Sequence, residues 1–332
     1  MFKVMMMISD NLIIFVPNIV RAKNNFVRTR LSCFVKKLIE ANGYKTTNDS
    51  SENYDIIHFP SYLDYIDNDY VIKGKKRNKR FIINGLTSVE EFEKIENNTF
   101  RLKKEVIEVY NEAFTVIVFF ETQKIALRHL GITSPIQVIK PIGEKFKEDT
   151  EIFKTSFASA YGLQNSQKYV INYGLYDSDA FDDYANLARI MPDLEFYYFG
   201  KKFDSFLISK RYEDTKRIPN LHFENLPPIE LVDAMFYSST LFLVTTNHKI
   251  DCLYLMDCML NRIPIVIKKN VFFEEMIENH AIEVDNFDDF YNSVRNILQN
   301  NKIEEAYEYA SKITYETEKG KLARIYEKYL KL

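Results

Sequence analysis

Cysteine is scarce in this sequence, which has three in 332 residues: Cys33, Cys252 and Cys258. The pair Cys252 and Cys258 lacks the spacing and the histidine partners of a zinc site. We therefore expect a reduced, cytosolic protein whose cysteines do not form a zinc site.

Long hydrophobic runs are lacking as well. The apolar stretch from Val4 to Val20 is interrupted by Asp10, Asn11, Pro17 and Asn18, and no small-residue cleavage site follows it. Because a spanning helix needs about 20 apolar residues in succession, we expect neither a transmembrane helix nor a signal peptide.

The chain has no strong net charge, since 44 basic residues face 47 acidic ones. This balance and the lack of a recognisable reader motif argue against a nucleic-acid partner. The charge is unevenly divided: residues 1–150 carry 23 basic and 19 acidic side chains, and the remainder carries 21 and 28. The first half is therefore basic and the second half acidic.

The composition is otherwise that of a globular protein, with 46% apolar and 27% charged residues. A chain of this length suits two domains of roughly 150 residues each. We expect a first domain over residues 1–150 and a second over residues 151–332, which includes the helical segment from Phe287 to Leu330. A charged linker is expected between Gly143 and about Phe157.

Strand-like and helix-like runs alternate in both halves, which is typical of α/β domains with covered parallel sheets. The expected strands are Lys3–Ile8, Asp55–Phe59, Arg80–Ile83, Thr115–Phe120, Gln137–Ile139, Lys168–Asn172, Glu195–Phe199, His222–Phe223, Leu241–Val244 and Ile263–Ile267. The expected helices are Phe26–Ala41, Leu102–Tyr110, Glu121–Leu130, Ser178–Ile190, Pro228–Phe236 and Leu253–Leu260.

The stretch from Thr245 to Ile267 is the most informative part of the sequence. A buried strand stops at Thr245, a loop with Asp251 follows, and Asp257 lies near the expected start of a short helix before the next strand. Ligands of open parallel sheets bind at the carboxyl ends of strands, so this loop is a candidate ligand site. Asp257 could accept hydrogen bonds from a ribose diol, or could simply be an acid favoured by the helix dipole.

Four segments of the sequence resemble retaining glycosyltransferases of family 4. Thr115 to Phe146 is similar to the end of that family's first domain, Lys168 to Gly200 to the opening of its second domain, and Ile218 to Ile267 to its donor-site segment ending in "EAma.G.Pvv". Tyr307 to Leu330 is similar to its closing helices. The resemblance implies a GT-B fold, with two Rossmann-like doubly wound domains facing a cleft.

The resemblance also implies roles for individual residues. Asp257 matches the later of the family's two acids, whereas the earlier one falls at Lys249, with His248 and Asp251 nearby. The predicted catalytic residues are accordingly Lys249, Asp251 and His248, although a solvated loop is the alternative for the last two. The Arg and Lys that grip the diphosphate in the family fall near Leu175 and Asp179, and Lys249 could supply the missing positive charge.

Donor and acceptor residues follow from the same resemblance. For the donor we expect Asp257 together with an Asn172-Tyr173-Gly174 turn, whose backbone N–H groups could face a diphosphate. For the acceptor we expect Asn24 and Asn25, which replace the family's glycine pair, and Asn84, which replaces its histidine.

A membrane surface is the expected partner of the first domain. The apolar stretch Asn11 to Val20, with Phe15 in its middle, is predicted to be an exposed loop beside a basic patch. The predicted membrane-binding residues are Phe15, Arg21, Lys23, Arg28, Arg30, Lys36, Lys37, Lys73, Lys75, Lys76, Arg77, Lys79 and Arg80. The alternative is a solvated helix face followed by a basic loop.

The resemblance thus implies transfer of glucose from UDP-glucose to a glycolipid at the cytoplasmic face of the cell membrane. The acceptor would be monoglucosyl diacylglycerol, and the new link α(1→2). Alternatives are an acceptor among capsule sugars or protein-linked glycans, or a non-catalytic glycosyltransferase-like subunit. We expect no tightly bound cofactor and no metal site, and at most stimulation by a divalent cation such as Mg²⁺.

Overall fold

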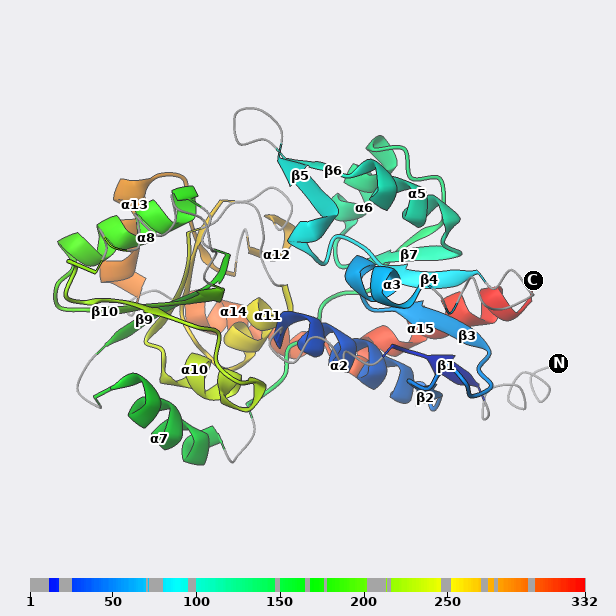
Figure 1. Cartoon of the computed structure of the whole chain (residues 1–332), viewed down its shortest axis with the longest axis horizontal. Helices are drawn as coiled ribbons and strands as arrows, with labels where there is room; N and C mark the ends of the chain where they lie inside the picture. Colours follow the sequence, from blue (N-terminus) through cyan, green and yellow to red (C-terminus); the bar gives the residue numbers. More distant parts are fainter. Residues whose placement is uncertain are drawn as a thin grey trace. The chain divides into compact units, whose positions relative to one another are not determined.

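A computed structural model describes residues 12–17, 26–69, 71, 80–94, 100–146, 150–164, 168–175, 178–201, 213, 216–245, 252–269, 274–277, 280–297 and 302–331 (Figure 1). The chain divides into two compact units. The first comprises Met1–Ile142 with Ile313–Leu332, and the second comprises Gly143–Lys312. The sequence placed residues 313–332 with the second domain, and the structure corrects this assignment.

The first unit contains a six-stranded parallel sheet in the order β2-β1-β3-β4-β7-β8. Its strands are β1 (Ile13–Phe15), β2 (Lys45–Thr47), β3 (Ile56–Phe59), β4 (Phe81–Asn84), β7 (Thr115–Val118) and β8 (Ile136–Val138). Its helices are α2 (Phe26–Glu40), α3 (Tyr62–Asn68), the short η1 (Val89–Glu91), α5 (Lys104–Glu112), α6 (Glu121–His129) and α15 (Tyr315–Leu330). A separate antiparallel pair is formed by β5 (Phe92–Lys94) and β6 (Phe100–Leu102).

The final helix, α15, packs against α2 within the first unit (Figure 1). Its buried side chains Glu318, Leu322, Ile325 and Tyr326 recur at helical spacing and therefore form one face. Glu318 accepts a hydrogen bond from the backbone N–H of Lys140 at 2.9 Å. Burial of this face explains why the last helix belongs to the first unit.

The second unit contains a six-stranded parallel sheet in the order β11-β10-β9-β12-β13-β14. Its strands are β9 (Tyr169–Leu175), β10 (Glu195–Lys201), β11 (Leu221–Glu224), β12 (Leu241–Val244), β13 (Ile265–Lys268) and β14 (Ile282–Val284). Its helices are α7 (Thr150–Tyr161), α8 (Ser178–Ile190), the short η3 (Ile229–Leu231), α10 (Val232–Ser238), α11 (Cys252–Leu260), α12 (Glu274–Ile277), α13 (Phe287–Asn296) and α14 (Lys302–Lys312).

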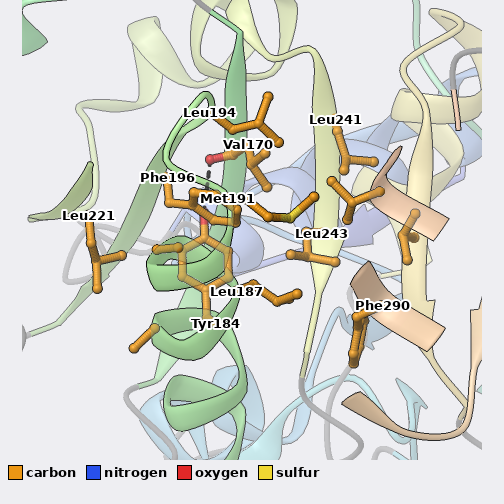
Figure 2. Packing of buried hydrophobic residues seen from close by; sticks show 14 of the residues in the cluster. Val170, Tyr184, Leu187, Met191, Leu194, Phe196, Leu221, Leu241, Leu243 and Phe290 are labelled. Atoms are coloured by element: carbon orange, nitrogen blue, oxygen red, sulfur yellow. Dashed lines mark hydrogen bonds between the residues drawn. The ribbon is translucent and has the colours of Figure 1, made fainter. Parts of the chain in front are cut away.

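The core of the second unit lies between its sheet and the helices α8 and α13 (Figure 2). Tyr184 and Leu187 of α8, and Met191 directly after it, follow helical spacing and are fully buried. The Tyr184 hydroxyl donates to the backbone carbonyls of Val170 at 2.8 Å and Tyr197 at 2.9 Å. This side chain therefore fixes α8 against two neighbouring strands.

The structure corrects the expectations for the first apolar stretch and for the linker. The stretch predicted to be an exposed apolar loop contains β1, an interior strand in which Ile14 and Phe15 are almost completely buried. The predicted linker reached Phe157, yet α7 already begins at Thr150. The predicted strand Lys3–Ile8 lies outside the described residues.

Candidate functional site

The strand order of the second unit identifies where a ligand would bind. After β9, the chain forms β10 and β11, which extend the sheet from one edge of β9. The next strand, β12, pairs with the opposite edge of β9. The direction of winding reverses between β9 and β12. In doubly wound sheets, such a switch point opens a crevice at the carboxyl ends of the strands.

Two buried polar side chains mark this switch point. Asn172 of β9 is 2% exposed, and Thr245, which directly follows β12, is 1% exposed. The Asn172 amide Nδ2 donates to the Thr245 hydroxyl oxygen at 3.2 Å. This hydrogen bond ties the end of β12, and therefore the start of the loop predicted to be catalytic, to the neighbouring strand.

The predicted Asn172-Tyr173-Gly174 turn is not a turn. β9 continues to Leu175, and Gly174 pairs in register with Gly200 of β10. The Tyr173 ring stacks on Phe242 of β12, with centroids 5.6 Å apart and planes inclined by 3°. Tyr173 is therefore a packing residue, and the strand end lies after Leu175.

Asp257 lies within α11, in its second turn, whereas the sequence placed it near the helix start. The helix is buried from Cys252 to Met259, and Asp257 is 3% exposed. Its Oδ1 accepts a hydrogen bond from the backbone N–H of Glu144 at 2.6 Å. Asp257 therefore binds protein backbone, and a contact with ribose stays a prediction.

The predicted catalytic residues His248, Lys249 and Asp251 lie outside the described residues. The structure describes a different lysine at the carboxyl end of a strand in this sheet. Lys268, the last residue of β13, forms an ion pair with Asp183 of α8 at 3.0 Å, and both side chains are 24% exposed. Sequence reasoning missed Lys268, although it directly follows the predicted strand Ile263–Ile267.

In the first unit, Asn84 is a buried residue of β4, and its contact with an acceptor stays a prediction. It is 2% exposed, and its Oδ1 lies 2.8 Å from Nε2 of His58. The other ring nitrogen of His58 lies 2.7 Å from the hydroxyl of Tyr326. Burial lowers the pKa of His58 to about 4, so the ring is neutral at physiological pH. Asn24 and Asn25 lie outside the described residues.

A carboxylate that the sequence did not single out organises the loop after β4. Glu91 is fully buried and accepts hydrogen bonds from the backbone N–H groups of Leu86, Thr87 and Ser88 at 2.8 to 2.9 Å. The Tyr110 hydroxyl also donates to it. Burial raises the pKa of Glu91, and these donors oppose the rise. The pattern Ser88-x-x-Glu91, a capping-box signature, could have identified it.

Three of the predicted membrane-binding residues have structural roles instead. Phe15 is 1% exposed and packs on Tyr54 with ring centroids 5.0 Å apart. Arg28 forms ion pairs with Asp64 at 2.6 Å and Asp67 at 2.9 Å. Arg30 is 8% exposed and donates to the carbonyl of Ile142 at 2.8 Å.

Of the other predicted membrane-binding cations, the structure describes some and not others. Lys36 is half-buried, and Lys37 and Arg80 are exposed. Those outside the described residues are Arg21, Lys23, Lys73, Lys75, Lys76, Arg77 and Lys79.

Among the described helices, none combines the length and apolar character needed to cross a bilayer. Nor do the described side chains include a group of three or more His, Cys, Asp and Glu residues placed to hold a metal ion.

Comparisons with known proteins agree with this architecture. No family model matches the sequence. The processive diacylglycerol alpha-glucosyltransferase of Acholeplasma laidlawii is 20% identical over 322 residues, covering 90% of this chain and 92% of the relative. The structure resembles sucrose-phosphate synthase from Thermosynechococcus elongatus, with a TM-score of 0.65 and 11% identity over 96% of this chain and 98% of that one.

A second similar structure is Anabaena Alr3699/HepE in complex with UDP-glucose, with a TM-score of 0.66 and 12% identity. That match covers 96% of this chain and 99% of the other. At such identities the likeness is one of fold. The two parallel six-stranded sheets with their covering helices are two Rossmann-like domains, and the chain has the GT-B fold.

Proposed function

We propose that the protein is a retaining glycosyltransferase that transfers glucose from UDP-glucose to a glycolipid. The acceptor is monoglucosyl diacylglycerol, which makes the enzyme a diglucosyl diacylglycerol synthase with α(1→2) specificity. The observation that carries the proposal is the similarity, over nine-tenths of the chain, to a relative named as a diacylglycerol glucosyltransferase. The GT-B fold supports it.

The donor binds at the switch point of the second unit. Asn172 and Thr245 hold the start of the loop after β12, whose residues His248, Lys249 and Asp251 contact the sugar and the diphosphate. Retaining transfer depends on positioning the sugar and on stabilising the leaving diphosphate, for which positive charge is needed. Lys249 and Lys268 supply that charge in place of the arginine and lysine that the family carries near Leu175 and Asp179.

The glycolipid acceptor is met at the cytoplasmic surface of the membrane, where the protein binds peripherally. The exposed cations Lys37 and Arg80 of the first unit support this part of the proposal. Each basic residue near an anionic bilayer contributes about 1 kcal/mol of attraction. Several such residues together give reversible binding, and Phe15 takes no part because it is buried.

A radiolabelled UDP-sugar panel tests the proposal. The intact protein is incubated with each donor and with micelles that contain monoglucosyl diacylglycerol and an anionic lipid, with and without Mg²⁺ and with EDTA. We expect label from UDP-glucose in a diglucosyl lipid, and loss of turnover in Lys249→Ala. Transfer only to capsule-type sugars or glycopeptides would contradict the glycolipid acceptor. Full activity in Lys249→Ala would contradict the role of Lys249 at the diphosphate.

A non-catalytic glycosyltransferase-like subunit is the second candidate. It is favoured by Leu175 in β9 and Asp179 in α8, which stand where the resemblance expects the cations that grip a diphosphate. The same panel separates the two functions. A folded protein that neither transfers nor hydrolyses any nucleotide sugar supports the second candidate.

A further inference from the structure

Two side chains at the end of α11 hold the backbone that enters the second unit. Asp257 Oδ1 accepts a hydrogen bond from the backbone N–H of Glu144 at 2.6 Å, and Asn261 Oδ1 accepts one from the backbone N–H of Phe146 at 3.0 Å. Asn261 Nδ2 also donates to the carbonyl of Glu144 at 2.8 Å. The Asn261 amide therefore pairs with this backbone much as a neighbouring strand would.

The two side chains are themselves fixed by the helix. Asn261 Nδ2 donates to the backbone carbonyl of Asp257 at 2.7 Å, and the Asn261 N–H donates to the same oxygen at 3.0 Å. Gly143 lies so close to α11 that an added Cβ would be 2.6 Å from the carbonyl oxygen of Met256. The backbone can approach this closely only with glycine at that position.

We infer that Asp257 and Asn261 form a clamp that fixes residues 143–146 to α11, and that Asp257 is a positioning residue of the linker rather than a ligand of the donor ribose. A ribose contact requires an accessible carboxylate, whereas Asp257 is 3% exposed and one of its oxygens is bound to Glu144. The chain passes from the first unit to the second at Ile142–Gly143, directly before the clamped residues. The clamp thus makes the linker enter the second unit at a fixed point.

This inference rests on the proposed function only where it concerns nucleotide binding. The clamp bonds join protein groups to one another, so we expect their loss to leave nucleotide affinity largely unchanged.

Hydrogen exchange of the full chain tests the clamp directly, with peptides that cover residues 141–147. We expect the Phe146 amide in Asn261→Ala and the Glu144 amide in Asp257→Ala to exchange about tenfold faster or more, since each loses its acceptor. Asp257→Asn keeps an acceptor oxygen and restores slow exchange. Arg262→Gln is the matched control, because it removes an ion pair with Glu304 beside the clamp but no clamp bond.

Gly143→Val provides a route that leaves both clamp side chains intact. It pushes the backbone away from Met256, so the same two amides should exchange faster while peptides of β12 keep their protection. Unchanged exchange at Glu144 and Phe146 in this variant and in both alanine variants would overturn the clamp.

Calorimetry with UDP separates the clamp from a ribose contact. For Asp257→Asn we expect UDP affinity within about twofold of the natural chain, as one retained acceptor oxygen suffices for the clamp. An affinity loss of about tenfold or more in this variant, with slow exchange preserved, would assign Asp257 to the ribose and overturn its positioning role. If the natural chain binds no nucleotide, the proposed function fails, and the exchange experiment still decides the clamp.

Discussion

The buried histidine of the first unit makes stability depend on pH in a way that can be calculated. Burial lowers the pKa of His58 from 6.5 to about 4, so the folded protein binds fewer protons than the unfolded chain between these values. The stability that neutral His58 provides is therefore complete above pH 6.5 and is lost as the pH falls towards 4. The shift corresponds to about 3 kcal/mol in total, of which about 2 kcal/mol is lost by pH 5.

The measurement is hydrogen exchange of β3 and α15 peptides in a urea series at pH 7, 6 and 5, for the natural chain and for His58→Gln. Glutamine cannot take up a proton in this range, so we expect the natural chain to lose about 2 kcal/mol more than the variant between pH 7 and pH 5. His129→Gln, at an exposed position on α6, serves as the control. Equal slopes for the natural chain and His58→Gln would refute the reasoning.

Three further predictions concern buried polar groups and charge. Asn220 donates from one amide to three backbone carbonyls at 2.8 to 3.0 Å, that of Ala188 in α8 and those of Met191 and Leu194 after it, so N220A should cost about 2 to 4 kcal/mol in urea unfolding. N186A, at an exposed α8 position, should cost under about 0.5 kcal/mol. Glu91→Gln turns an N–H donor towards backbone N–H groups and should cost about 2 kcal/mol, measured in the same way. Lys268→Ala should raise the Kd for UDP about tenfold in calorimetry with secondary structure unchanged by circular dichroism, and an unchanged Kd would exclude Lys268 from the donor site.

Periodic apolar patterns were sufficient to predict most of the elements. The strand Leu241–Val244 and the helix Ser178–Ile190 have the predicted bounds, and the helix predicted over Phe26–Ala41 is observed as Phe26–Glu40. These segments are strongly periodic or uniformly apolar, so local pattern and final structure agree. The two-domain GT-B architecture followed from their alternation together with the family resemblance.

The errors arose where the outcome depends on residues far apart in the sequence. The apolar stretch around Phe15 was interpreted as an exposed loop because a short apolar run looks the same on a surface as in a sheet. Only pairing with β2 and β3 shows that it is buried. Asp257 was predicted to bind the donor from near the start of a helix, but its observed partner, Glu144, lies 113 positions away.

Asn84 shows the same limitation in the first unit. Its position suggested an acceptor contact, whereas its partner His58 comes from a neighbouring strand and Tyr326 from the last helix. No local pattern links three positions spread over 268 residues. Glu91 is different, because its capping-box pattern is local and could have been recognised.

The return of α15 to the first unit has a consequence for biosynthesis. A ribosome delivers domains in order, and the domain made first usually folds first. Here the second unit lies wholly between Gly143 and Lys312 and is complete before the first one is. The hydrogen bond between the His58 ring and the Tyr326 hydroxyl can form only after residue 326 has been synthesised. The half of the protein that is translated first is therefore the half that finishes folding last.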